Sequence, residues 1–282
     1  MRNYHFMRFP GGKMRAFTMS YDDGVASDIR LMDIMRKNGL RGSFNINAGF
    51  LANEDTDVAA RPTSRLSLGQ IKEYYRDFEV ATHGYAHPFY KDLPVSGAVY
   101  DIVRDREELE HAFGRIIRGH AYPNGAYTEE TKEAFRLSGI IYARTTRATR
   151  AFGIPEDLLE YHPTCHHNDD LDAICASFLA DATYATSPRL FCLWGHSYEF
   201  VTNNNWEKIE AFAEKIGGNE KIWYAGMEEV FAYVRAYRSL VFSMDASVVY
   251  NPTATDIWLA LDVHDKNIVC VHAGETLAVK SV

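Results

Sequence analysis

Three short segments carry side chains that could do hydrolytic chemistry, and each follows an apolar stretch of the chain. Asp22 and Asp23 follow the first stretch. His83 and His87 follow the second and lie four residues apart, so one helical turn would place both rings on one face. His196 follows the third. The spacing therefore marks three places where reactive groups could be presented together.

Two imidazoles and a carboxylate can hold a divalent transition metal and leave positions open for water and substrate. Adjacent aspartates in a turn point in different directions, so one can ligate the metal while the other faces the water. A carboxylate within reach of that water is a candidate general base, and His196 is a candidate general acid. Each motif alone also fits a helix cap, a surface histidine or a buried structural histidine.

The elements that must position these groups alternate between strand and helix. Because such alternation is typical of a parallel sheet covered by helices, the chain is predicted to be an α/β protein with seven or eight β/α units, closed or nearly closed into a barrel. We expect strands at 16–21, 42–46, 78–82, 120–123, 140–145, 190–194 and 221–224. We expect helices at about 29–39, from the Ser67 cap to 78, and at 99–117, 128–139, 171–182, 206–216 and 227–237.

Composition excludes several classes of protein. The chain has 282 residues, of which 46% are hydrophobic, and a net charge of −8. This content excludes a disordered chain, and the negative charge argues against nucleic-acid binding. We expect no membrane partner, since no apolar run approaches about 18 residues, and no signal peptide in residues 1–20, hence a cytoplasmic protein. No phosphate-binding glycine motif follows a strand. The sequence assigns no oligomeric state.

The pattern changes after residue 238. Short strands are expected at 247–250, 257–263 and 268–272, separated by turn residues. We therefore divide the chain into a barrel domain, 1–238, and a C-terminal β extension, 239–282. About 45 residues bury little core alone, so the extension is predicted to pack on the barrel. The four cysteines, at 165, 175, 192 and 270, show no metal-binding spacing and are interpreted as buried thiols.

These motifs, in this order, resemble the polysaccharide deacetylase family, the chitooligosaccharide deacetylase group of carbohydrate esterase family 4. Residues 20–24 (SYDDG) resemble the first family motif, T-[FY]-D-D-G, and residues 83–87 (HGYAH) the second, H-[ST]-x-x-H. Residues 121–125 (AYPNG) partly match R-x-P-[YF]-G, and residues 193–196 (LWGH) resemble the final L-x-H. The resemblance runs from about residue 16 to 238 and implies a deformed (β/α) barrel.

The resemblance also implies a function. It implies removal of acetyl groups from an N- or O-acetylated oligosaccharide or sugar conjugate, with one divalent metal, commonly Zn²⁺, although Co²⁺, Ni²⁺ or Mn²⁺ are compatible. By position, the metal ligands would be Asp23, His83 and His87. Asp22 would be the base, His196 the acid, and the Asn124 N–H part of an oxyanion hole. Aromatic or histidine side chains expected to contact substrate are Tyr85, Tyr122, Trp194, His166 and His167.

Four departures from the family pattern define a divergent subgroup. Gly84 replaces the hydroxyl residue of the second motif, Ala121 replaces the arginine that holds the base, and Asn124 stands at the place of the usual tyrosine. The fourth motif, an Asp- and Trp-bearing segment, is not recognisable, and a histidine-rich segment, 162–170, stands in its region. A substitute for the arginine could come from His166 or His167, which we favour, or from Arg144 or Arg147. The remaining alternative is that nothing replaces it and the base is held more loosely.

Two other functions remain open. The same scaffold could bind glycans without turnover, since the third and fourth motifs are degraded. Two histidines and a carboxylate also suit non-haem iron enzymes of another class. Asp22 and His196 favour hydrolysis, because pure binding needs neither a base nor an acid.

Overall fold

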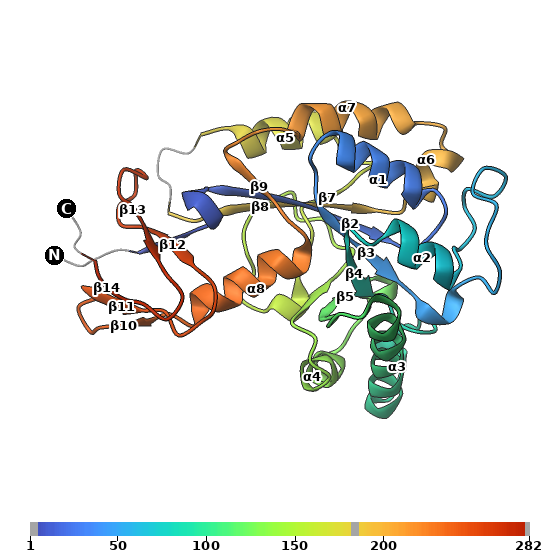
Figure 1. The fold of residues 1–282 in the computed structure, drawn as a ribbon, viewed down its shortest axis with the longest axis horizontal. Coiled ribbons are helices and arrows are strands. Elements are labelled where there is room, and N and C mark those ends of the chain that lie inside the picture. The colour runs from blue at the N-terminus through green and yellow to red at the C-terminus, as the bar shows by residue number, and fades with distance from the viewer. Residues whose placement is uncertain (1–4, 182–185, 280–282) are drawn as a thin grey trace.

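A curled parallel sheet forms the centre of the computed structural model, which describes residues 5–181 and 186–279 (Figure 1). The strand order is β6-β5-β4-β3-β2-β8-β7. One side of β2 pairs with two strands in turn: β9 pairs with its first residues and β3 with its last. The strands are β2 (Arg15–Asp22), β3 (Gly42–Ile46), β4 (Glu79–Thr82), β5 (Gly119–Ala121), β6 (Tyr142–Arg144), β7 (Cys165–His166), β8 (Arg189–Gly195) and β9 (Ile222–Tyr224).

The segment between β6 and β7 nearly closes this sheet into a barrel. The Tyr161 N–H donates to the Ala143 carbonyl (2.9 Å), and the Thr145 N–H donates to the Tyr161 carbonyl (2.8 Å). Three residues later the Thr164 N–H donates to the Cys192 carbonyl of β8 (3.0 Å). The chain therefore crosses from one edge of the sheet to the other within residues 161–164, which confirms a deformed (β/α) barrel.

Helices surround the sheet, and two begin at the caps that the sequence predicts. Ser67 with Gln70 and Thr128 with Thr131 form capping boxes. The α-helices are α1 (Asp28–Lys37), α2 (Leu68–Tyr74), α3 (Val95–Phe113), α4 (Glu129–Leu137), α5 (Leu171–Leu179), α6 (Tyr198–Thr202), α7 (Trp206–Ile216) and α8 (Met227–Arg238). The 3₁₀ helices are η1 (Pro10–Gly12), η2 (Ala48–Phe50), η3 (Tyr90–Asp92), η4 (Pro123–Gly125) and η5 (Leu158–Glu160).

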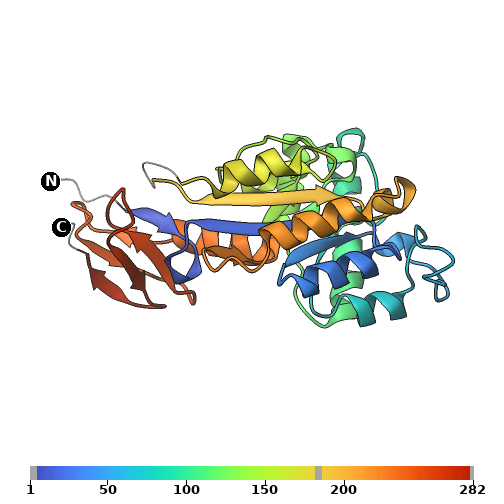
Figure 2. The same ribbon diagram turned by 90° about the horizontal axis from the view of Figure 1, so that it is seen from above.

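The C-terminal residues form two small antiparallel sheets at one end of the barrel (Figures 1 and 2). One sheet has the order β1-β12-β13 and the other β10-β11-β14. Their strands are β1 (Phe6–Arg8), β10 (Val241–Phe242), β11 (Val248–Tyr250), β12 (Ile257–Ala260), β13 (Ile268–Val271) and β14 (Thr276–Ala278). Buried residues of α8, such as Met227 and Phe231, share one core with Ile257 and Val271. The extension therefore packs on α8, and β1 adds an N-terminal strand to it.

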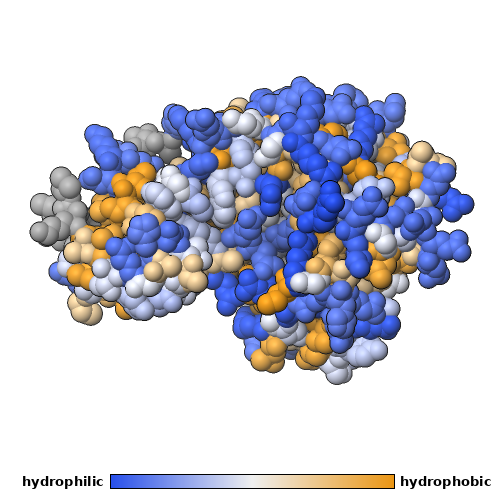
Figure 3. All heavy atoms as spheres, viewed as in Figure 1, coloured by the Kyte–Doolittle hydropathy of each residue, from blue (hydrophilic) through white to orange (hydrophobic). Residues whose placement is uncertain are grey.

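The differences from the predicted elements are local. The two-residue β7 and the five-residue α6 are too short for a periodic pattern to reveal, and both lie beside the candidate site. The helix predicted to reach residue 182 ends at Leu179, and residue 182 itself lies outside the described residues. Within the described ranges, no helix is both long and apolar enough to cross a bilayer. The face in Figure 3 is mostly hydrophilic, with apolar residues in small separate patches.

Candidate active site

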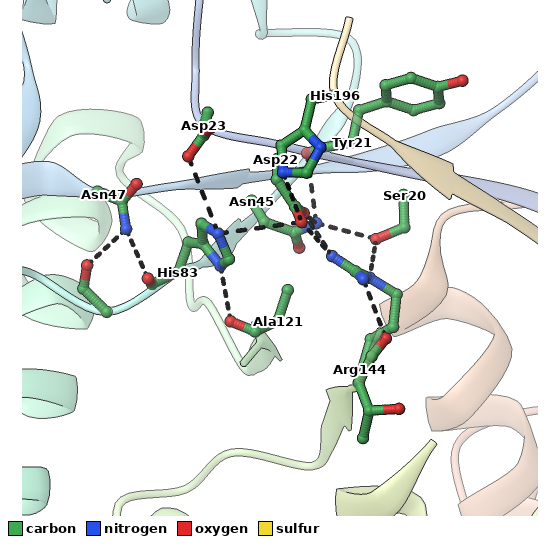
Figure 4. Close-up of polar contacts among 12 residues, drawn as sticks. Ser20, Tyr21, Asp22, Asp23, Asn45, Asn47, His83, Ala121, Arg144 and His196 are labelled. Atoms are coloured by element: carbon green, nitrogen blue, oxygen red, sulfur yellow. Dashed lines mark hydrogen bonds and ion pairs between the residues drawn. The ribbon is translucent and has the colours of Figure 1, made fainter. Parts of the chain in front are cut away.

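The predicted reactive residues meet at the C-terminal ends of the barrel strands. Asp22 ends β2, His83 follows β4, and His196 follows β8. Figure 4 shows these side chains converging, with Asp22 between the two histidines. The Nε2 atoms of His83 and His196 each lie 3.9 Å from Asp22 Oδ2. In β/α barrels this edge of the sheet is the one that carries reactive groups.

The surroundings of His83 prepare it to act as a metal ligand. Its Nδ1 lies 2.7 Å from the Ala121 carbonyl, which only accepts hydrogen bonds, so Nδ1 carries a proton. Burial lowers the pKa of His83 to about 4, against the opposing charges of Asp22 and Asp23, so the ring is neutral at ordinary pH. The Nε2 lone pair therefore points toward the two aspartates. Metal-ligating histidines commonly donate their other N–H in this way.

One ligand atom each from Asp23, His83 and His87 lies within 4.8 Å of the others, so the donor set fits a divalent transition metal. His83 Nε2 is 3.9 Å from Asp23 Oδ1. The side chain of Asp23 is 13% exposed, so solvent reaches this group. The Arg65 guanidinium donates to the same Asp23 oxygen (2.9 Å) and would compete with a metal for it.

Two carboxylates of α3 hold the loop that carries the histidines. Asp105, which is fully buried, accepts the His83 N–H at 3.0 Å. Asp101, one helical turn earlier, accepts the N–H groups of Tyr85 and Ala86, each at 3.0 Å. Because both carboxylates project from one face of α3, the helix fixes both ends of the motif.

The site also contains strained backbone. Asp23, His87 and Asn124 have φ of 92°, 49° and 57°, in the left-handed region that non-glycine residues rarely adopt. Gly84 has φ of 75°, and a Cβ there would lie 2.8 Å from the Tyr90 hydroxyl. This explains why the hydroxyl residue of the second motif is replaced by glycine. Such outliers cluster at functional sites.

Arg144 occupies the place of the missing arginine. It is fully buried, and its Nη2 donates to both carboxylate oxygens of Asp22, with a distance of 2.6 Å to Oδ2. Burial alone would raise the pKa of Asp22, but the charge of Arg144, followed by those of His83 and His196, holds it well below the ordinary value. Asn45 Nδ2 adds a further hydrogen bond of 2.7 Å to Asp22.

The register of the sheet explains how Arg144 reaches this position. Arg144 on β6 is paired with Ala121 on β5, so the arginine has moved to the neighbouring strand at the same level. The prediction of an arginine substitute is confirmed at Arg144. The favoured histidine substitute is wrong, because His166 and His167 face a different carboxylate, Glu199.

Glu199 on α6 collects three histidines around one carboxylate. Its Oε1 lies 2.8 Å from His196 Nδ1 and 3.4 Å from His166 Nε2, and its Oε2 lies 3.2 Å from His167 Nε2. Burial alone would raise the pKa of Glu199, but hydrogen bonds from His166, His167 and His196 hold it far below its ordinary value. Although burial opposes it, the hydrogen bond to Glu199 and the charge of Asp22 raise the pKa of His196.

Of the three histidines, His196 is hydrogen-bonded to Glu199, while His166 and His167 lie beside the carboxylate at ion-pair distance. The Nδ1 of His166 accepts the Asn168 N–H (3.2 Å), so its proton sits on Nε2. The Nδ1 of His167 lies 3.2 Å from the Tyr21 hydroxyl, which can donate to it. His166, His196 and Glu199 have metal-like spacing, but this tautomer of His166 makes the group a hydrogen-bond network.

Burial corrects part of the predicted substrate surface. Tyr122 and His167 have 0% exposure, so neither can contact substrate. Trp194 is only 8% exposed, and the Arg144 guanidinium lies 4.8 Å from its ring. Tyr85 is partly buried under Arg104, whose guanidinium lies 3.7 Å from the ring centre. His166, at 20% side-chain exposure, remains at the solvent edge of the network.

Asn124 lies in η4, directly after β5, and its side chain is exposed. Its position next to the strand that supports His83 agrees with a place at the rim of the site. Its role as an oxyanion donor stays a prediction.

Three residues that contact the candidate site were not predicted from the sequence. Glu199 follows His196 by three residues, a spacing that the turn leading into α6 converts into contact. Asn45, at the level of Asp22 on the adjacent strand, and Asp105, in the long α3, had no motif to mark them. Of the three, only Glu199 could have been found from a local sequence pattern, its spacing from His196.

Taken together, the fold and site define a barrel with two aspartates and three histidines gathered at its strand ends. A family model described as polysaccharide deacetylase matches residues 4–143. The chain therefore belongs to the polysaccharide deacetylase family, through the half that carries Asp22, His83 and His87.

One solved structure of low sequence identity shares this fold, and two others are similar to parts of the chain at lower scores. A Mycobacterium smegmatis protein named for the polysaccharide deacetylases has 15% identity and a TM-score of 0.58, covering 84% of this chain and 96% of its own. A Streptococcus pyogenes deacetylase, PplD in complex with acetate, has 18% identity and a TM-score of 0.43; the match covers 51% of this chain and 61% of PplD. A carbohydrate esterase family 4 pseudoenzyme from Bacillus anthracis has 12% identity and a TM-score of 0.46, covering 80% and 68%. The comparison with curated proteins finds no match.

Proposed function

We propose that the protein is a metal-dependent hydrolase that removes acetyl groups from an N- or O-acetylated oligosaccharide or sugar conjugate. Family membership and fold support a carbohydrate deacetylase in general terms. The observation that carries the finer proposal is the position of Asp22, with His83 and His196 each 3.9 Å away and the metal-ligand triad alongside.

Asp23, His83 and His87 would hold the metal, with Zn²⁺ the ion that best suits two imidazoles and a carboxylate. When bound, such an ion supplies Lewis-acid chemistry, polarising a carbonyl group and making water more acidic. Asp22 accepts a proton from the attacking water. Arg144 keeps that carboxylate ionised and fixed in direction, which suits a base that must be ready at every working pH.

His196 acts on the opposite side of the reacting bond. Its Nδ1–H donates to Glu199, so its Nε2 faces the site and carries the transferable proton of the imidazolium. As the tetrahedral adduct collapses, Nε2 gives this proton to the departing amine or alkoxide, and acetate is released. Glu199 raises the pKa of His196, which increases the protonated fraction.

The two rival functions explain less of the site. A protein that only binds glycans needs no buried arginine holding an ionised Asp22 beside a carboxylate-supported histidine. An iron oxygenase needs a facial triad but no acid–base pair.

Acetate release tests the proposal. The full-length protein would be screened against N- and O-acetylated sugars and oligosaccharides with Zn²⁺, Co²⁺, Ni²⁺ or Mn²⁺ supplied. We expect release with at least one substrate and metal, and loss of both activity and one equivalent of metal in His83→Ala and His87→Ala. An exposed histidine of α3, His111, provides the control His111→Ala. No acetate from any substrate, or unchanged metal content in both variants, would refute the proposal.

A further inference from the structure

A second group of metal-type ligands lies in the C-terminal extension, at the end of the β12–β13 hairpin (Figure 1). Ile257 pairs with Val271, so Asp256 lies opposite His272 at the next position. Cys270 precedes His272 by two residues on the same strand. Because side chains alternate along a strand, Asp256, Cys270 and His272 all project from one face of the hairpin.

The donor atoms of this group converge. His272 Nδ1 lies 3.0 Å from Asp256 Oδ2 and 3.8 Å from Cys270 Sγ, and all three atoms are within 4.8 Å of one another. A tetrahedral zinc with bonds of about 2.0–2.3 Å places its donor atoms about 3.4–3.6 Å apart. The observed separations bracket this value, so small side-chain rotations would complete the geometry.

Hydrogen bonds orient the donor atoms of the group. The other oxygen of Asp256, Oδ1, accepts the Ala273 N–H (2.9 Å), which aims Oδ2 at the group. Oδ2 accepts the ring proton of His272 from Nδ1, as Glu199 accepts a proton from His196 Nδ1. Among the described residues none bonds His272 Nε2, so a metal that binds Nδ1 would displace the ring proton to Nε2.

The local charge also favours a cation. Glu275 accepts the His272 N–H (2.7 Å), which brings a second carboxylate beside the group. Of the four cysteines, the other three are buried, so Cys270 alone offers sulfur to solvent.

We propose that Asp256, Cys270 and His272 form a second metal site, which binds Zn²⁺ or a similar divalent transition metal and ties the ends of β12 and β13 together. A thiolate, an imidazole and a carboxylate are a zinc-type donor set, and a water would complete four-coordination. Since β12 also pairs with β1, the bound ion would stabilise the sheet that joins the N-terminal strand to the extension. The proposal is independent of the deacetylase function.

Cobalt provides a direct test, because thiolate bound to Co²⁺ gives a charge-transfer absorption in the near ultraviolet that nitrogen and oxygen ligands do not. Titration of the reduced full-length protein with Co²⁺ should produce this absorption and saturate it by two equivalents, one for each proposed metal site, and excess Zn²⁺ should abolish it. Cys270→Ser should lose the absorption, and His272→Ala should weaken binding at least tenfold. His264→Ala, a change at the other end of the hairpin, should leave it intact.

Metal stoichiometry separates this site from the candidate active site. Native mass spectrometry should show one zinc fewer in Cys270→Ser than in the parent. In a separate thermal unfolding experiment, zinc should raise the melting temperature of the parent more than that of the variant. His83→Ala should keep the cobalt–sulfur absorption even if all deacetylase activity is lost. Absence of the absorption in the parent, or its persistence in Cys270→Ser, would overturn the proposal.

Discussion

Two carboxylates flank His196, and they are held in opposite ways. Asp22 is 2% exposed and accepts hydrogen bonds from Arg144, whose guanidinium is charged at every working pH. Glu199 is partly exposed and is surrounded by three imidazoles, His166, His167 and His196, which can titrate. In the proposed mechanism this difference separates two requirements of one site: a base whose charge does not vary and an acid whose proton must move.

The three imidazoles are not equivalent. Burial lowers the pKa of His167 to about 4, so this ring stays neutral beside Glu199. His196 has a raised pKa, because Glu199 and Asp22 both favour its charged form. The pH dependence of the site should therefore enter mainly through His196.

The largest effect is expected from Asp22→Asn, which keeps the shape of the side chain and removes its basicity. General bases typically contribute about 10²–10⁴-fold, so kcat should fall by that order. Metal content should be unchanged, because Asp23 and the two histidines remain. Parental turnover in this variant would show that the arginine-held carboxylate is not the base.

Removing Arg144 should affect both stability and pH dependence. Breaking a buried ion pair costs about 3–5 kcal/mol, since one charge is left uncompensated. The lowered pKa of Asp22 contributes stability above its ordinary pKa, and this is lost as pH falls through the folded value. Arg144→Ala should therefore be destabilised most near neutral pH and approach the parent in acid. Its acidic limb of kcat/KM should move to higher pH, because buried Asp22 loses its counter-charge.

A matched ion pair provides the control. Arg150 and Asp169 are 2.8 Å apart, but the Arg150 side chain is 67% exposed. Arg150→Ala should cost at most about 1 kcal/mol in urea unfolding and leave the pH profile unchanged. Equal losses in the two arginine variants would contradict the distinct role given to Arg144.

The same contrast shows what the sequence could reveal. Asp22, His83, His87 and His196 were found because each follows an apolar strand, and strand ends gather at one edge of a barrel. Arg144 could only be placed among several candidates, since its contact with Asp22 depends on the pairing of β5 with β6. Tyr122 was misjudged because position after a strand does not tell whether a ring turns inward to the core. Local sequence pattern therefore could not predict the contacts that depend on strand register and on side-chain packing.

Glu199→Gln should have a smaller effect than loss of the base. The substitution keeps the size of the side chain but removes the charge that raises the pKa of His196. A group with a raised pKa stays protonated to higher pH, so the basic limb of kcat/KM should move to lower pH in the variant. Comparison with Glu207→Gln, at an exposed position of α7, controls for the general charge change. A basic limb that does not move would remove Glu199 from control of the acid.

The smallest effect, and the finest test of the comparison, is expected from His166→Ala. Glu199 would lose one of its three donors and keep His167 and His196, so its negative charge would act more strongly on His196. The basic limb should then move slightly to higher pH, opposite in sign to Glu199→Gln, while kcat stays within a few-fold of the parent.

The measurement is again the pH profile of kcat/KM, with metal content determined in parallel. If His166 instead contacts substrate, as its exposed edge permits, KM would rise with no change in the basic limb. A loss as large as that of Glu199→Gln, in the same direction, would mean that the three histidines act as one unit and that Glu199 does not distribute its charge among separate donors.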